Sequence, residues 1–177
     1  DTEIVGVLKQ TLSLMEIREL DQISGIMLIC DADNLWADDK RCKLLDSIEE
    51  IQDFNLDEKT MLLDVQIKKI PLYTFIFPDN SNKGNLENLL LESAAVEYPE
   101  LLNLATSYVD NASAFCRELK KEPKAKKAKV GCIANAMKPG KANQVSIADD
   151  DWVSERTLIE CSMLRRLNMT VNEMISK

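Results

Sequence analysis

The chain has 177 residues, of which 45% are hydrophobic, and carries a net charge of −8. A chain of this size buries about 70% of the surface that it exposes when unfolded, so we expect one globular domain with a sizeable core. Its lack of histidine excludes Ser-His-Asp and Cys-His nucleophilic sites and the common His-containing zinc sites.

The sequence also lacks the features of an exported or membrane protein. No stretch approaches the roughly 20 consecutive apolar residues of a membrane span, and the first ten residues contain no basic region followed by an apolar one. The five cysteines are scattered and include no Cys-x-x-Cys pair, so we expect small core residues rather than a disulfide framework. We therefore expect a soluble, cytoplasmic protein with no membrane contact.

In the first half of the chain, helical and extended patterns alternate. Residues 3–20 place apolar side chains at helical spacing. Residues 25–30 form a continuous apolar run, typical of a strand buried on both faces in a parallel sheet. Asp38 and Asp39 would then cap a helix and complement its dipole. An aromatic and β-branched run predicts a second strand at residues 72–77.

Two strands are too few for a stable sheet, which usually has three or more. The segment at residues 55–69 has an ambiguous pattern and is left unassigned. Two explanations stay open at this point. Either residues 61–68 contain a third strand, or part of the sheet lies upstream of the chain.

The second half of the chain is predicted to be helical. A turn cluster leads into one helix, a longer helix follows, and a helical tail starts near Asp149. Pro123 and a run of charges interrupt the helical pattern between them. The apolar faces predicted for the three helices are Leu86, Leu89, Leu90 and Ala94; Leu101, Leu104, Tyr108, Ala112, Phe115 and Leu119; and Leu164, Leu167, Val171 and Met174.

Together these patterns predict the α/β fold class, with a small parallel sheet flanked by helices and a helical C-terminal part. Residues 1–120 would form the α/β core. Residues 121–177 would form a basic connector and C-terminal helices that pack on the same domain.

The first candidate site residues are Asp31 and Asp33, at the end of the first predicted strand. The backbone turns at a strand end, so both carboxylates can converge on one cation, which would remove their mutual repulsion. Oxygen ligands suit hard cations, so Mg²⁺ or Mn²⁺ is the metal class that fits. The structural alternative is that both are turn and cap residues.

A second group of polar residues follows the second predicted strand. Asp79 stands at the end of that strand, and Glu87 lies in the first turn of the next helix. Neighbouring parallel strands would bring these acids towards Asp31 and Asp33. Glu87 also fits a capping arrangement, and Lys83 fits either a phosphate contact or an exposed turn lysine.

These two blocks, LICDADN and FIFPDNSNKGNLENLLLE, resemble the TOPRIM superfamily. The likeness is to TOPRIM-like bacterial proteins related to the nuclease domains of overcoming-lysogenization-defect ATPases. In them a strand ending in D-x-D, a strand ending in P-D-N and a G-x-L-E helix start recur in this order. The resemblance spans roughly residues 25–95, with a weaker likeness at residues 133–152.

The resemblance implies metal-dependent phosphodiester chemistry. Asp31, Asp33 and Glu87 match the family's catalytic, metal-binding acids, and Asp79 would be an auxiliary ligand. Two ions about 3.5 to 4 Å apart would stabilise the attacking and leaving oxygens. The family's first strand, which ends in a glutamate, has no counterpart here, because Glu3 lies in helical sequence. We expect that segment either to lie upstream or to be lost in a degenerate relative.

The charge distribution bears on nucleic-acid binding. From Arg117 to Lys141 there are nine basic and two acidic residues, although the whole chain is acidic. Lys124, Lys126 and Lys127 are candidates for phosphate contacts. The alternative is a solvated connector, since no aromatic residue is interleaved to stack on bases. We expect Trp36 and Trp152 to be packing residues.

Two functions follow from different classes. The first is a magnesium-dependent nuclease or nuclease-like subunit that acts on nucleic acid, in bacterial anti-phage defence beside an ATPase partner, and it could form an oligomer. The second is a non-catalytic TOPRIM-like module that docks a partner protein. A phosphatase of the haloacid dehalogenase type is a third reading of D-x-D, but Asn34 is not followed by the Thr or Val of that motif.

Overall fold

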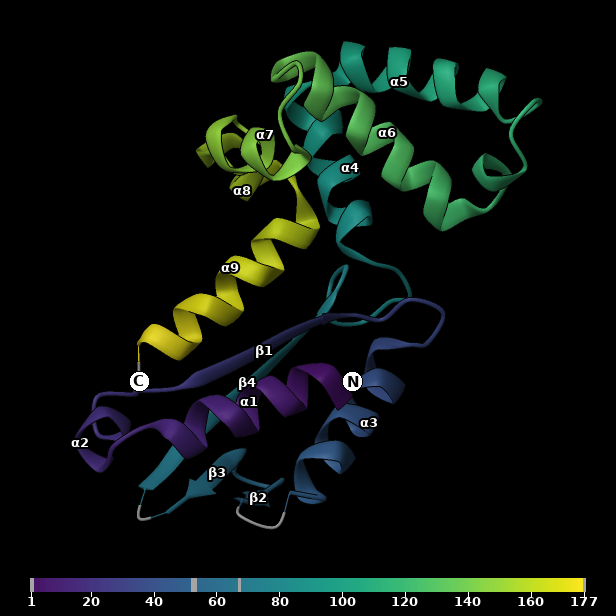
Figure 1. The fold of residues 1–177 in the computed structure, drawn as a ribbon. Helices are drawn as coiled ribbons and strands as arrows, with labels where there is room; N and C mark the ends of the chain where they lie inside the picture. Colours follow the sequence, from purple (N-terminus) through teal and green to yellow (C-terminus); the bar gives the residue numbers. More distant parts are fainter. Residues whose placement is uncertain (1, 52–53, 67, 177) are drawn as a thin grey trace. The chain divides into compact units, whose positions relative to one another are not determined.

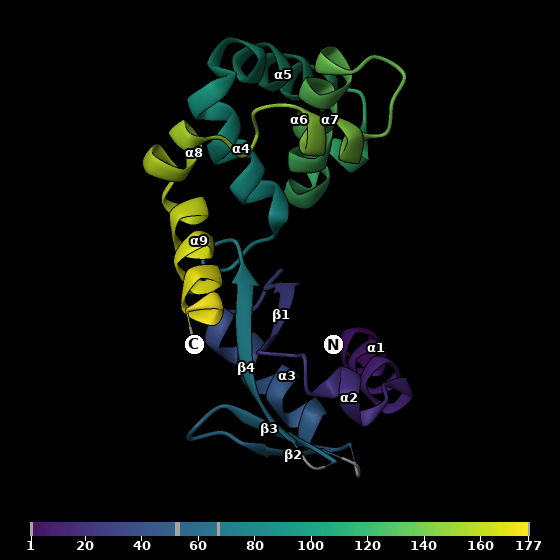
Figure 2. The ribbon, with the colours of Figure 1, turned by 90° about the vertical axis from the view of Figure 1, so that its left-hand side faces the viewer.

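The computed structural model describes residues 2–51, 54–66 and 68–176. The chain divides into two compact units: residues up to Lys83 together with those from Leu167 onward, and Gly84–Arg166. Figure 1 and Figure 2 show their labelled elements from two sides. The domain boundary predicted at residue 120 lies inside the second unit and remains a prediction.

The first unit contains a mixed four-stranded sheet in the order β1-β4-β3-β2. β1 and β4 are parallel, whereas β3 is antiparallel to both β4 and β2. Of the two explanations left open for the missing strand, the one that places a third strand within residues 61–68 is met by β3. The strands are β1 (Ile26–Asp31), β2 (Phe54–Asp57), β3 (Leu62–Val65) and β4 (Lys68–Phe77).

β4 changes its neighbour halfway along its length. Residues 68–71 pair with β3, and residues 72–77 pair with β1. Pro71 lies at the changeover, where its missing N–H interrupts the ladder least. The parallel part of the sheet thus consists of β1 and the second half of β4.

The position of β1 corrects one expectation. We predicted burial on both faces, but of its six residues only Leu28 is fully buried, and Ile29 is 39% exposed. The reason is that β1 lies at the edge of the sheet, where β4 is its only neighbour among the described strands.

Three helices complete the first unit. The helix predicted over residues 3–20 is divided in two, because Glu16 starts a new helix by pairing its N–H with Glu19 Oε2 at 2.8 Å. The third helix contacts β2, β4 and the first helix. The helices are α1 (Thr2–Leu14), α2 (Ile17–Leu20) and α3 (Ala37–Glu49).

α3 follows its prediction closely. Asp38 and Asp39 lie in its first turn, where their charges complement the dipole, although the capping position belongs to Trp36. Its apolar residues join one core cluster of the first unit. That cluster includes Leu8, Leu12, Leu20, Leu28, Leu44, Leu45, Ile48, Leu63, Val65, Ile70, Leu72 and Ile76.

The second unit is helical throughout its described elements. α9 begins in this unit, and its residues from Leu167 onward belong to the first. The elements are α4 (Leu86–Glu97), α5 (Pro99–Ala112), the 3₁₀ helix η1 (Arg117–Lys120), α6 (Glu122–Met137), α7 (Asn143–Asp149), α8 (Glu155–Glu160) and α9 (Ser162–Ile175).

The basic run is helix and not the connector that we expected. Pro123 lies in the first turn of α6, where its missing N–H costs no helical hydrogen bond. The same helix continues to Met137 and buries Val130, Ile133 and Ala134. A proline that was taken as an interruption therefore starts the helix.

The apolar face predicted for α5 is also wrong. Leu104 and Tyr108 are exposed, whereas their neighbours Ala105 and Val109 are buried. The inward face is thus rotated by one residue from the prediction, and α5 packs against α4 and α6 with Ala105 and Val109 buried.

The fold class is confirmed: an α/β fold in which helices flank a four-stranded sheet and the C-terminal part is helical. The sheet is mixed and not parallel as predicted, because β3 pairs antiparallel with both β2 and β4. Among the described helices, none combines the length and apolar composition needed to cross a membrane.

Candidate functional site at the carboxyl end of β1 and β4

The parallel pair β1 and β4 ends at one edge of the sheet. Asp31, the last residue of β1, is in register with Phe77, the last residue of β4, and Ala32 N donates to Phe77 O at 3.0 Å. Asp79 follows β4 by two residues. The register therefore places Asp31 and Asp79 on loops that leave the same edge of the sheet, as the sequence predicted.

Asp33 lies on the turn that follows β1. Its φ is +54°, a left-handed conformation that aspartate tolerates better than most residues. Between the two acids, Ala32 is fully buried and its carbonyl accepts from Leu35 N at 3.1 Å. The turn is thus anchored at Ala32, while the Asp33 side chain is exposed to solvent.

Asp79 organises its own loop. Its Oδ1 accepts from Ser81 N at 3.1 Å and Asn82 N at 2.8 Å, and its Oδ2 accepts from Asn82 Nδ2 at 2.7 Å. Hydrogen bonds from residues two and three positions further on are typical of an Asp-initiated turn. These three bonds occupy much of the acceptor capacity of the carboxylate, so Asp79 fits a loop-holding role better than direct metal ligation.

Arg41 and Asn80 hold the loop after β4, and the sequence analysis missed both. The Arg41 guanidinium donates to Thr74 Oγ1 at 3.1 Å and Asn80 Oδ1 at 2.7 Å, and it also pairs with Asp38 at 2.5 Å. Asn80 Oδ1 accepts in addition from Ile76 N at 3.1 Å. Asn80 has a φ of +64°, a left-handed conformation that asparagine tolerates in turns. An asparagine directly after Pro-Asp was therefore the feature of the sequence that could have indicated this turn.

Trp36 and Lys83 bring the two loops together. Lys83 Nζ lies 5.2 Å from the centre of the Trp36 ring, within the range of a cation–π contact. Trp36 is 53% exposed, so the expectation that it is a packing residue is wrong. Trp152 is fully buried, with its ring edge-on to Tyr98 at 5.7 Å, and is a packing residue as expected.

The Cys30 thiol beside these acids is not an activated nucleophile. Burial raises its pKa, and the carboxylates of Asp31 and Asp33 raise it further, although Lys40 opposes them. Because the thiolate is the reactive form, the environment keeps Cys30 unreactive at neutral pH.

Asp31 and Asp33 are the residues of this edge that suit a hard cation. Within residues 2–51, 54–66 and 68–176, no three or more His, Cys, Asp or Glu side chains gather closely enough to hold a metal ion. Mg²⁺ usually keeps several water ligands and is bound through one or two carboxylates and substrate phosphates. Asp31, half-buried at the end of β1, and Asp33, exposed on the turn that follows, could supply such a pair of carboxylates.

Glu87 belongs to the second unit and has a partner there. Its side chain is 16% exposed and pairs with Lys127 Nζ at 3.8 Å. Both residues line a cavity of about 260 Å³, together with Leu86, Val130 and Asn143. This ion pair is a different structural role from the capping arrangement considered for Glu87, because the N3 position of the α4 capping box is Asn88.

The basic candidates on α6 differ from one another. Lys126 pairs with Glu122 at 2.7 Å and donates to Asn88 Oδ1 at 3.2 Å. The hydrogen bond from Lys126 and its charge lower the pKa of Glu122. Lys124 is exposed and forms no ion pair with the described residues. Lys124 is therefore the most available of the three predicted phosphate contacts.

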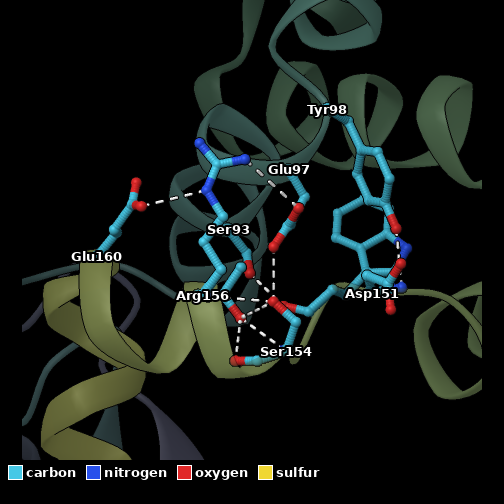
Figure 3. A network of polar contacts seen from close by, with 9 residues as sticks. Ser93, Glu97, Tyr98, Asp151, Ser154, Arg156 and Glu160 are labelled. Carbon is cyan, nitrogen blue, oxygen red and sulfur yellow. Dashed lines mark hydrogen bonds and ion pairs between the residues drawn. The ribbon is translucent and has the colours of Figure 1, made fainter.

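A second polar cluster of this unit joins α4 to α8 and the residues before it (Figure 3). Ser154 Oγ donates to Glu97 Oε1 at 2.6 Å and accepts from Thr157 N at 3.1 Å, so it caps α8 while bonding α4. Tyr98 Oη accepts from Asp151 N at 2.8 Å, and Ser93 Oγ donates to the Trp152 carbonyl. These hydrogen bonds cap α8 and pair with backbone groups between α7 and α8. The cluster therefore holds these segments together and has a structural role.

Comparison with known proteins adds one finding. A family model described as a protein of unknown function (DUF3226) matches residues 2–167. Neither the comparison with curated proteins nor the comparison with solved structures found a match.

Proposed function

The chain belongs to the DUF3226 family, and we propose that it is a metal-dependent nuclease or nuclease-like subunit that cleaves phosphodiester bonds at the carboxyl end of β1. The observation that supports this proposal best is the register of the parallel pair. It places the D-x-D turn beside the loop after β4, at the sheet edge where α/β proteins bind their ligands. The resemblance to TOPRIM-like nucleases supports the same chemistry.

Each residue of this edge has a distinct role in the proposal. Asp31 and Asp33 would hold Mg²⁺ or Mn²⁺. The bound ion would polarise a phosphoryl oxygen and lower the pKa of a coordinated water. Asp79 and Asn80 shape the neighbouring loop, and Arg41 fixes that loop against α3. Lys83 supplies a positive charge for a substrate phosphate.

Cleavage of supercoiled plasmid and of single-stranded DNA and RNA, in Mg²⁺ and in Mn²⁺, tests the proposal. We expect Asp31→Asn and Asp33→Asn each to lower the rate by more than the 10- to 100-fold typical of groups that only support a metal ligand. Asp46→Asn is the matched control, because Asp46 is an exposed aspartate on α3. Cleavage that survives both substitutions would refute the assignment.

A non-catalytic module that docks a partner protein is the second candidate. Its support comes from the second unit, where Leu104, Tyr108 and Phe115 are 67%, 65% and 94% exposed. Large apolar side chains exposed in this way mark interaction sites when they cluster. The ATPase partner and the defence role rest on the resemblance alone. Two results together would favour the module: the chain shows no cleavage activity, and its binding to a partner protein requires these three side chains.

A further inference from the structure

We propose that Trp36 and Lys83 form a nucleotide-binding pair, in which the Trp36 ring stacks on a base and Lys83 contacts the neighbouring phosphate. This inference rests on the proposed function and deepens it, because it names the part of the substrate that lies beside the cation. Trp36 is the aromatic residue available for stacking here, because residues 31–35 and 78–85 contain no Phe, Tyr or Trp.

The backbone of Trp36 is held in place while its ring faces solvent. The residue has extended backbone angles, φ −71° and ψ 152°, at the start of α3. Ala37 is fully buried, and Trp36 O accepts from Lys40 N at 3.0 Å. A large aromatic ring that is half exposed on a fixed backbone is a ready stacking surface.

Lys83 places a positive charge directly beside that ring. Its ammonium lies 5.2 Å from the ring centre, and it forms no ion pair with the described residues. A cation–π contact at an exposed site stabilises the pair only weakly. A substrate phosphate can therefore replace the Trp36 ring as the partner of the Lys83 ammonium. The face of the ring is then free to stack on a base.

The charge around the pair makes binding depend on a cation. Asp31 ends β1, Asp33 lies on the turn that follows, and Asp39 lies in the first turn of α3; each would repel a phosphate. A divalent ion on Asp31 and Asp33 removes that repulsion. Single-stranded nucleic acid is the substrate form that fits, because its bases are free to stack on an aromatic side chain.

The two tryptophans provide the measurement. Trp36 is exposed and Trp152 is fully buried, so a base that stacks on Trp36 quenches part of the emission and leaves the remainder unchanged. We expect a single-stranded oligothymidylate to quench the full chain in Ca²⁺, which takes the same kind of oxygen ligands as Mg²⁺, and not in EDTA. The affinity is measured independently by the fluorescence anisotropy of a labelled oligothymidylate.

Substitutions separate the two contacts. Trp36→Ala should weaken binding about tenfold or more, whereas Trp36→Phe should retain most of the affinity and lose the quenching. Lys83→Ala should reduce the slope of log affinity against log salt by about 0.7 to 1. Lys59→Ala is the control, since Lys59 is an exposed lysine on the turn between β2 and β3.

The outcomes distinguish this inference from the proposed function. Binding that Trp36→Ala leaves unchanged, or a wild-type chain that does not bind the oligonucleotide, would overturn the inference. Cleavage that is insensitive to Trp36→Ala would overturn it too, while leaving the nuclease proposal intact. Quenching through Trp36 without any cleavage would support the inference and count against catalysis.

Discussion

Glu92 shows how main-chain donors decide the role of a single carboxylate. Its oxygens accept from Ser162 N at 3.0 Å and from Met163 N at 3.1 Å, at the start of α9. Burial alone would raise the pKa of Glu92, but hydrogen bonds from Cys161, Ser162 and Met163 hold it below its ordinary value of 4.5. Glu92 therefore satisfies the first N–H groups of α9.

The lowered pKa of Glu92 predicts a dependence of stability on pH. A carboxyl group whose folded pKa is below its unfolded pKa stabilises the fold above the unfolded value, and this contribution is lost as the pH falls through the folded pKa. We expect Glu92→Gln to lower the urea midpoint at neutral pH. The difference from wild type should shrink as the pH falls below about 4.5. Glu100→Gln, at an exposed position, should show no such trend.

Cysteine reactivity offers a second test at this scale. Burial and the Glu92 carboxylate raise the pKa of Cys161 to about 11, so its thiol stays protonated at neutral pH. Cys42 and Cys116 are exposed. We expect a thiol reagent to label Cys42 and Cys116 in the folded chain and Cys161 only after unfolding, as read by mass spectrometry of peptides. Labelling of Cys161 at the rate of Cys116 would contradict the structure.

Among the elements, β4 is tied to α2 by one side chain. Lys68 Nζ donates to the carbonyls of Leu20, Asp21 and Ile23 at 2.7, 2.7 and 2.9 Å. These carbonyls lie at the end of α2 and just after it, where a cation compensates the helix dipole. The start of β4 and the segment that leads into β1 are thereby joined.

Removing this tie should destabilise the first unit. We expect Lys68→Ala to cost about 1.5 to 3 kcal/mol of unfolding free energy, because hydrogen bonds from a charged group are lost and three carbonyls need new partners. Its neighbour Lys69 is exposed, so Lys69→Ala should stay within about 0.5 kcal/mol of wild type. Urea unfolding of both variants provides the comparison, and equal effects would refute the proposed tie.

The orientation of α5 can be tested in the same way. Val109 is buried and Leu104 is two-thirds exposed. Val109→Ala should lower the stability of the second unit by about 1 to 3 kcal/mol, because it opens a cavity. Leu104→Ala should change it by no more than about 0.5 kcal/mol. The reverse order would mean that the face predicted from the sequence is the buried one.

At the scale of the whole molecule, the division into two units predicts independent folding. Gly84–Arg166 has its own buried apolar residues, which include Leu89, Leu90, Val109, Ile133, Trp152 and Leu164. We expect a fragment of these residues to give a helical circular dichroism spectrum and to unfold cooperatively. A fragment that remains an unfolded chain would show that the second unit depends on the first.

The sequence by itself determined the features that depend on local periodicity and on the residues that start and end helices and strands. It located α3 and α4, the strand at residues 72–77, and the acids that follow β1 and β4, because spacing, capping and strand-ending residues act over a few positions. It also indicated that the ends of two parallel strands would meet, which the register of Asp31 with Phe77 confirms.

Only the tertiary structure decided which elements are neighbours. An apolar strand such as β1 has the same composition at the edge of a sheet as at its centre, and the sequence predicted burial on both faces, which the edge position does not give. The buried face of α5, the exposure of Trp36, the loop-holding bonds of Asp79 and the partner of Glu87 all depend on contacts between residues far apart in the chain or on how a turn closes. Burial and hydrogen bonding are set by what lies beside a residue in space, and a linear pattern carries little of that information.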